Sequence, residues 1–125
     1  MNKFFRILLI TILNFFLISF PSVYGDEKIK IGILVPLTGD NSKLGKQILK
    51  SVRMALKDIN NNQIEIYPKD TKSDPNKTLR SASELQEAGI NLVIGPVFYE
   101  NLIYLNEINN ITFLSLTNKT LDLPK

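Results

Sequence analysis

Two kinds of hydrophobic period alternate along residues 29–116, and this alternation restricts the fold more than any other feature of the sequence. Residues 29–37 are almost all apolar, which is typical of a strand covered on both faces of a sheet. Residues 42–60 then place apolar side chains at the spacing of one helix face: Leu44, Ile48, Leu49, Val52, Ala55, Leu56 and Ile59. The sequence therefore predicts a buried strand followed by a helix that packs back against it.

The same alternation continues to the end of the chain. A second strand is predicted at residues 64–67, and a second helix begins after Asp74, an N-cap residue with proline at the next position. Gly89 suits the left-handed stop of that helix, and residues 90–96 read as a third strand. A third helix is predicted from steps of four, three and three between Phe98, Leu102, Leu105 and Ile108, and residues 111–116 form a fourth strand.

Four strands that alternate with three helices predict an α/β fold, a parallel sheet with helices on both faces. Ligands of such sheets bind beyond the carboxyl ends of the strands, where the connecting loops meet. The sequence places four loops at this edge: residues 36–42, 69–74, 95–99 and 115–118. Any binding site is expected among them.

The first 25 residues have the pattern of a secretory signal peptide. Lys3 and Arg6 provide a positive start, residues 7–20 are mostly apolar, and Pro21 ends the run shortly before a small residue, Gly25. The apolar run is short for a bilayer span, which needs about 20 residues, although an uncleaved membrane anchor stays open as an alternative. We therefore expect residues 1–25 to be a signal peptide and residues 26–125 to be one exported domain.

Charge and cysteine content narrow the location and the partners further. The chain has no cysteine, so it cannot carry a lipid on an N-terminal cysteine, and a periplasmic location without lipid is expected. Of its 15 basic residues, 13 remain against 12 acidic ones once Lys3 and Arg6 leave with the signal peptide. The domain is therefore almost neutral, and no nucleic-acid partner is expected. The basic residues of the first helix are interpreted as a solvated face: Lys43, Lys46, Lys50, Arg53 and Lys57.

The residue types for catalysis are missing as well. Without histidine and cysteine, no catalytic triad, Cys-His pair or histidine metal site can form, and the carboxylates show no paired spacing. Gly39 and Gly45 are six residues apart and fit no phosphate-binding motif, so we interpret them as a turn residue and a close-packing residue. No enzyme activity, cofactor or metal is expected.

Five blocks of the sequence, in this order, resemble the type I periplasmic binding proteins, most closely the leucine/isoleucine/valine-binding family: KIKIGILVPLTG, LGKQILKSVRMALKDIN, DTKSDPNKTLRSASEL, NLVIGPV and ITFLSLTNKTLDL. The resemblance runs from residue 28 to residue 123. It implies two α/β lobes that close on a small polar ligand such as an amino acid and deliver it to a membrane permease. Only part of the first, N-terminal lobe has a counterpart in this sequence, so a fragment is expected.

The resemblance also implies ligand-binding positions. The hydroxyl residue that follows the IG block in the family falls on Tyr99, and the ligand-binding loop after the fourth strand falls on Thr117 and Asn118. With Thr38 in the first loop, these residues are the predicted ligand-binding set. The match is partial, because Glu100 beside Tyr99 would repel a ligand carboxylate.

A second branch of the same fold stays open. The segments VIGPVFYENL and FLSLTNKT resemble the penicillin-binding-protein activators, envelope proteins that stimulate peptidoglycan synthases. Many of those proteins are lipoproteins, and this chain lacks the cysteine that a lipoprotein needs. The two hypotheses are therefore a transport-type receptor and an activator whose partner is a penicillin-binding protein. Among single residues, Phe98 is interpreted as a core residue and Asp74 as a helix cap. Whether the side chain of Asp70 faces the cleft is left open.

Overall fold

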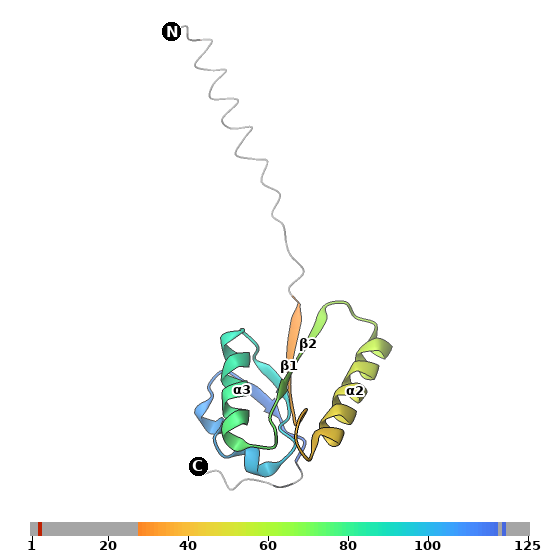
Figure 1. Ribbon diagram of the computed structural model, residues 1–125. Coiled ribbons are helices and arrows are strands. Elements are labelled where there is room, and N and C mark those ends of the chain that lie inside the picture. Colours follow the sequence, from red (N-terminus) through yellow and green to blue (C-terminus); the bar gives the residue numbers. More distant parts are fainter. Residues whose placement is uncertain (1–2, 4–27, 118, 120–125) are drawn as a thin grey trace.

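The computed structural model describes residues 3, 28–117 and 119 of the 125-residue chain (Figure 1). The predicted signal peptide, apart from Lys3, and the predicted site residue Asn118 lie outside the described residues. The elements in chain order are β1 (Ile29–Val35), α2 (Ser42–Ile59), β2 (Ile64–Asp70), α3 (Pro75–Glu87), β3 (Leu92–Ile94), the 3₁₀ turns η1 (Tyr99–Leu102) and η2 (Leu105–Glu107), and β4 (Thr112–Leu114).

The four strands form one parallel sheet in the order β2-β1-β3-β4. β1 is the central strand, pairing with β2 on one side and with β3 on the other. Helices α2 and α3 lie on opposite faces of the sheet (Figure 1). The predicted α/β architecture, a parallel sheet with helices on both faces, is therefore confirmed.

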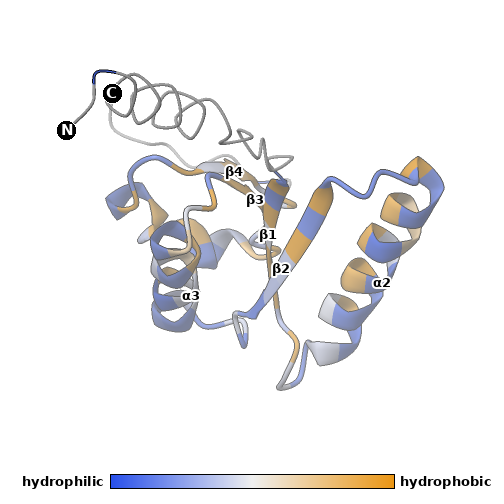
Figure 2. Cartoon of the chain, turned by 90° about the horizontal axis from the view of Figure 1, so that it is seen from above, coloured by the Kyte–Doolittle hydropathy of each residue, from blue (hydrophilic) through white to orange (hydrophobic). Residues whose placement is uncertain are grey.

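Alternation along β1 builds a core on each face of the sheet. Ile33 and Val35 are fully buried on one face, where Leu49 of α2 packs on them. Leu34 is fully buried on the other face in a cluster that includes Leu85 of α3. Successive side chains of a strand point to opposite faces, so one apolar run supplies both cores. Figure 2 shows the apolar side of α2 turned toward the sheet.

The predicted start of the second helix is confirmed in detail. Asp74 is the N-cap of α3, and its Oδ1 accepts a hydrogen bond of 2.7 Å from the backbone N–H of Lys77. Pro75 occupies the first helical position, where its missing N–H costs nothing. Beyond the other end of α3, Gly89 has a φ of +72°, the left-handed conformation predicted for it.

The third predicted helix is wrong, because residues 99–107 form two 3₁₀ turns in place of an α-helix. The apolar spacing of three residues between Leu102, Leu105 and Ile108 matches the 3₁₀ period of three residues per turn. Residues 99–110 also hold four asparagines, which are poor α-helix formers. These turns nevertheless cover the same face of the sheet as α3.

Candidate functional site

Because all four strands are parallel, the loops after them lie at one edge of the sheet, which we call the rim (the lower edge in Figure 1). Thr38 follows β1, Tyr99 follows β3 and Thr117 follows β4, so three predicted site residues lie along this edge. The rim has two halves, formed by the loops after β1 and β2 and by the loops after β3 and β4.

Asp70, the last residue of β2, joins the two loops of the first half of the rim through its carboxylate. Its Oδ2 accepts from the hydroxyl of Thr38 at 2.6 Å, and its Oδ1 accepts from the backbone N–H of Leu37 at 2.7 Å. Oδ1 also accepts from the backbone N–H groups of Thr38 at 3.2 Å and of Lys72 at 3.0 Å. The hydroxyl proton of Thr38 is thus used in the hydrogen bond to Asp70, so the Thr38 side chain joins the loop after β1 to the end of β2.

Electrostatics agree with this role of Asp70. Burial acts to raise the pKa of the carboxyl group, but hydrogen bonds from the Thr38 hydroxyl and from the Lys72, Leu37 and Thr38 backbone amides outweigh it. The pKa of Asp70 is therefore held below its ordinary value. The ionised carboxylate is the form that accepts all four hydrogen bonds, and it holds the loops after β1 and β2 together.

The second half of the rim contains a pocket of about 420 Å³, which we call the rim pocket. It is lined by Val97, Phe98, Tyr99, Glu100, Leu116, Thr117 and Lys119. Tyr99 and Thr117, two predicted site residues, therefore line one pocket although they are far apart in the sequence. The loops that carry them are joined, because the Leu116 N–H donates to the carbonyl of Pro96 at 3.0 Å.

The structure adds Lys119, which is not among the predicted site residues, to the lining of this pocket. Its Nζ lies 4.5 Å from the centre of the Tyr99 ring, within the range of a cation–π interaction. Its backbone N–H donates to the Thr117 hydroxyl at 3.3 Å. Glu100 adds a negative charge to the lining, so the rim pocket has one cationic and one anionic side chain.

The sequence misjudged one lining residue and did not predict another. The sequence favours Phe98 as core, but Phe98 is half-buried and lines the rim pocket. Lys119 is a sequence neighbour of Thr117, and this adjacency is its only local signal, whereas the sequence already places the charge of Glu100 beside Tyr99. Among the described residues, no three acidic side chains gather into a metal site, and the lining offers hydroxyls, charges and apolar surface for reversible binding.

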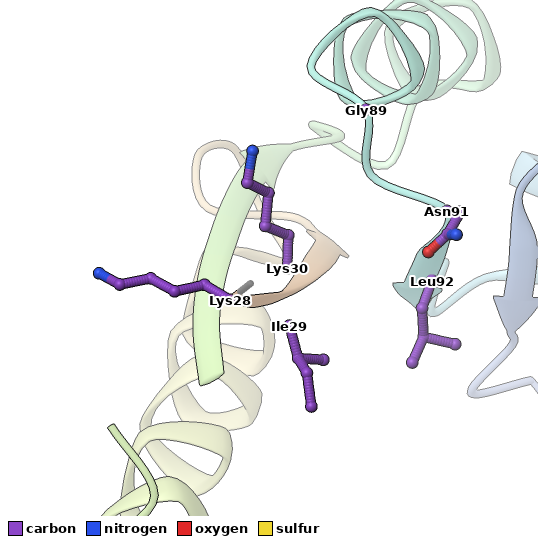
Figure 3. A pocket seen from close by; sticks show the side chains of 6 residues that line it. All are labelled: Lys28, Ile29, Lys30, Gly89, Asn91 and Leu92. Carbon is purple, nitrogen blue, oxygen red and sulfur yellow. The ribbon is translucent and has the colours of Figure 1, made fainter. Parts of the chain in front are cut away.

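A second hollow, of about 450 Å³, lies at the opposite edge of the sheet, beside the amino ends of β1 and β3. Figure 3 shows that the side chains of Lys28 and Lys30, two of its lining residues, point away from each other. The ammonium group of Lys28 forms an ion pair with Glu65. The hollow contains none of the predicted site residues, whereas the rim pocket contains Tyr99 and Thr117, so we regard the rim pocket as the candidate site.

The basic stripe of α2 is a solvated face, as the sequence predicts. All five basic residues of the α2 stripe are exposed: Lys43, Lys46, Lys50, Arg53 and Lys57. In the described part of the chain, none of the helices has the length and apolar character to span a bilayer.

Comparison with known proteins gives a family match and several similar structures. A family model described as periplasmic binding protein matches residues 28–120. No curated protein sequence matches the chain.

Among solved structures, the C-domain of LpoA (YraM) from Haemophilus influenzae, described as a regulator of PBP1A, is 27% identical with a TM-score of 0.59. A solute binding protein of an ABC transporter from Rhodopseudomonas palustris, in complex with 3,4-dihydroxybenzoic acid, is 24% identical with a TM-score of 0.66. The leucine binding protein LivK from Thermotoga maritima is 19% identical with a TM-score of 0.62. At such identities, the last two show a shared fold alone.

These matches cover 69%, 71% and 70% of this chain, respectively, but only 27% of each of the other three chains. The sequence thus corresponds to a part of one lobe in proteins that are much longer.

Proposed function

Since the chain belongs to the periplasmic binding protein family, we propose that it is part of an extracytoplasmic receptor for a small polar ligand, of the kind that serves an ABC transporter. The ligand class that we propose is an amino acid, and the partner would be a membrane permease. The mechanism is reversible recognition by loop side chains, without bond-making.

The observation that carries this proposal is the rim pocket. It joins Tyr99 and Thr117 at the carboxyl ends of parallel strands, the edge at which open α/β sheets bind ligands. Tyr99 offers an aromatic surface with a polar tip, and the Thr117 hydroxyl can donate or accept a hydrogen bond. In our proposal Thr38 and Asn118 also belong to the ligand-binding set, with Thr38 acting mainly through its hydrogen bond to Asp70.

The charges of the pocket favour a zwitterion. Lys119 can attract a carboxylate and Glu100 an ammonium group, and both line the same pocket. Glu100 alone would oppose an anionic ligand such as an aromatic acid, whereas an amino acid satisfies both charges. A single lobe covers only one side of a ligand, so binding by this chain alone is expected to be weak, with a Kd of about 1 mM or more.

Protein NMR can test the proposal at such weak affinity. We expect amide shifts of residues 97–100 and 115–117 to move with millimolar leucine or another amino acid of a panel, and to move less with 3,4-dihydroxybenzoate. Lys119→Gln should weaken the effect at least about threefold, whereas Lys57→Gln, a matched exposed lysine on α2, should not. Shifts that stay unchanged across the whole panel would rule out an amino-acid site.

A second function is favoured by the match to LpoA, which at 27% identity exceeds that to the two solute-binding proteins described above. Under this hypothesis the rim contacts a penicillin-binding protein, and the domain regulates peptidoglycan synthesis. Purified chain should then bind a purified penicillin-binding protein and raise its synthase rate. Binding without any change of that rate, or no binding at micromolar concentrations, would remove this hypothesis.

For localisation, the family implies a place outside the cytoplasm. We propose that residues 1–25 direct export and are removed, and that no lipid is attached because the chain has no cysteine. The N-terminus of the protein recovered from the periplasm should then be Asp26. A product that starts at residue 1 and sediments with membranes would show an uncleaved anchor instead.

A further inference from the structure

The α2 stripe concentrates positive charge on one surface of an almost neutral domain. Its five basic residues follow one another at steps of three, four, three and four, so they stay on one side of the helix: Lys43, Lys46, Lys50, Arg53 and Lys57. At a rise of 1.5 Å per residue, the stripe is about 21 Å long. Asp58 is the only acidic residue within Ser42–Ile59. The helix therefore presents a row of cations and not a mixture of both signs.

The cations of the stripe are not neutralised by the described part of the domain. All five side chains are exposed, and the ion pairs among the described residues are formed by other lysines, Lys28 and Lys69. On the opposite face of the sheet, the layer of α3, η1 and η2 (residues 75–107) carries four acidic and two basic residues, so the two faces differ in sign. Such a segregated charge favours a partner with a negative surface.

The shape of this surface suits a broad partner. α2 is the outer layer on its side of the sheet, and no described element lies outside it (Figure 1). Neither the rim pocket nor the hollow at the opposite edge is lined by a residue of α2. The outer side of a helix is convex, so it can contact a flat surface along its whole length but cannot enclose a small ligand.

An exposed apolar side chain lies within the row of cations. Met54 is 57% exposed, and it follows Lys50 by four residues and precedes Lys57 by three. Residues three and four apart are neighbours on a helix surface, so Met54 lies between these two lysines. Basic residues with an apolar side chain among them are typical of helices that lie on membrane surfaces.

We propose that the α2 stripe binds the surface of a membrane that contains anionic phospholipids. The headgroup surface is flat and negatively charged, so it can contact the whole row of cations at once, while Met54 enters the boundary between headgroups and acyl chains. The family implies a place outside the cytoplasm, where a membrane surface is at hand. This inference goes beyond the proposed functions, and it holds for a receptor and for an activator alike.

Attachment through α2 leaves the rim accessible. α2 covers a face of the sheet, whereas the rim is the edge beyond the carboxyl ends of the strands (Figure 1). A domain that lies on α2 therefore opens its rim along the membrane plane. A partner embedded in the same membrane can reach the rim pocket from the side.

Vesicle co-sedimentation of the full chain tests the proposal. One kind of vesicle contains one part phosphatidylglycerol to two parts phosphatidylcholine, and the other contains phosphatidylcholine alone. The readout is the ratio of the two partition coefficients, in which an apolar contribution of the predicted signal peptide cancels. We expect a ratio of at least about fifty at low salt, and a fall to less than about five near 0.5 M salt, because salt screens exposed charges.

Two triple variants locate the effect on the stripe. The stripe variant replaces three of its cations: Lys46→Gln, Lys50→Gln and Arg53→Gln. The control variant removes the same charge outside α2: Lys30→Gln, Lys77→Gln and Arg80→Gln. The stripe variant should lower the ratio at least about tenfold, since each basic residue near an anionic surface strengthens binding about fivefold. The control variant should lower it less than about threefold.

Equal losses in the two triple variants would overturn the proposal, as would equal partition of the natural chain on both kinds of vesicle. An acidic protein is the alternative partner of such a stripe. Binding to polyglutamate that the stripe variant loses, without any binding to anionic vesicles, would show that alternative and would also overturn the proposal.

Tryptophan fluorescence identifies the surface that touches the lipid. The chain has no tryptophan, so Met54→Trp and Ile103→Trp each introduce a single reporter, at positions that are 57% and 50% exposed. With anionic vesicles, the emission of Met54→Trp should shift to the blue because its side chain leaves water. The emission of Ile103→Trp, outside α2, should stay unchanged. A shift at Ile103→Trp alone, or at neither position, would contradict attachment through α2.

Discussion

At the scale of single residues, Asp70 illustrates how a candidate ligand residue can serve the framework instead. The sequence left open whether Asp70 faces the cleft. In the structure it accepts four hydrogen bonds from groups of three residues, which joins the loops after β1 and β2. Among the predicted site residues, Thr38 therefore serves the framework through its hydrogen bond to Asp70, whereas Tyr99 and Thr117 line the rim pocket.

The lowered pKa of Asp70 predicts a pH dependence of stability. A carboxyl group whose pKa is lower in the folded state than in the unfolded state stabilises the fold above its unfolded pKa, about 4. That contribution is lost as the pH falls through the folded pKa. We therefore expect the urea midpoint of the natural chain to fall between pH 6 and pH 3 by more than that of Asp70→Asn.

At pH 6, Asp70→Asn should also be less stable by on the order of 1 kcal/mol, because an amide accepts fewer and weaker hydrogen bonds. The exposed carboxylates Glu65 and Glu84, whose pKa values are lowered by hydrogen bonds from Lys28 and Lys69, titrate alike in both proteins. Parallel curves for the two proteins would therefore contradict the role of Asp70.

Asn101 offers a second test at this scale. Its side chain is 1% exposed, and in the described part of the chain neither amide atom has a hydrogen-bond partner. An unpartnered buried amide costs about 1–3 kcal/mol, so Asn101→Leu should leave the free energy of unfolding unchanged or raise it. Asn101→Asp should lower it by more than about 2 kcal/mol, because it buries an unpaired charge. Urea unfolding measures both, and a large loss in Asn101→Leu would reveal a hidden partner.

At the scale of elements, the helices differ in how their starts are held. α3 has the Asp74 cap and Pro75, whereas Asn41 makes no side-chain cap hydrogen bond to α2. The first turn of α2 is instead pressed against the end of β1, since a Cβ on Gly45 would lie 1.9 Å from the carbonyl oxygen of Pro36. Gly45 is therefore a close-packing residue, as the sequence analysis interpreted it.

The contact at Gly45 reverses a common expectation for helices. Glycine to alanine in an exposed helix interior gains about 1 kcal/mol, because alanine is the better helix former. Here the added methyl group meets backbone atoms that cannot shift freely, so Gly45→Ala should lower the free energy of unfolding by about 1–3 kcal/mol. Ser51→Ala, at an exposed position of the same helix, should change stability by less than about 0.5 kcal/mol. Chemical denaturation would compare the two, and equal effects would refute the close contact.

At the scale of the whole molecule, the order β2-β1-β3-β4 decides how stability is distributed. β1 is paired on both sides and buried on both faces, so it belongs to both cores. β4 is three residues long, lies at the edge of the sheet, and has an exposed leucine. The described domain should therefore loosen from the β4 side first.

Hydrogen exchange can measure this gradient. We expect the amides of Ile33 and Leu34 in β1 to be among the slowest, with β4 amides exchanging about tenfold faster or more, because local opening at an edge needs less free energy than global unfolding. Uniform protection across the sheet would contradict this distribution of stability.

The sequence by itself determined the order of the four strands and of two helices along the chain, the parallel sheet with helices on both faces, the Asp74 cap and the turn at Gly89. These features follow from the spacing of apolar residues and from local backbone preferences, both of which are encoded by residues close together in the sequence. It misjudged residues 98–108, where an apolar spacing of three fits a 3₁₀ turn as well as a helix, and where Phe98 faces the rim pocket.

The sequence predicted that four loops meet at one edge, but only the tertiary structure decided which of their side chains contact one another. Thr38 donates to Asp70 across 32 positions of sequence, and Lys119 lies over the ring of Tyr99. The exposure of Leu114 likewise depends on the place of β4 in the strand order. No local period encodes these contacts, because they arise when residues distant in the chain are brought together by the sheet.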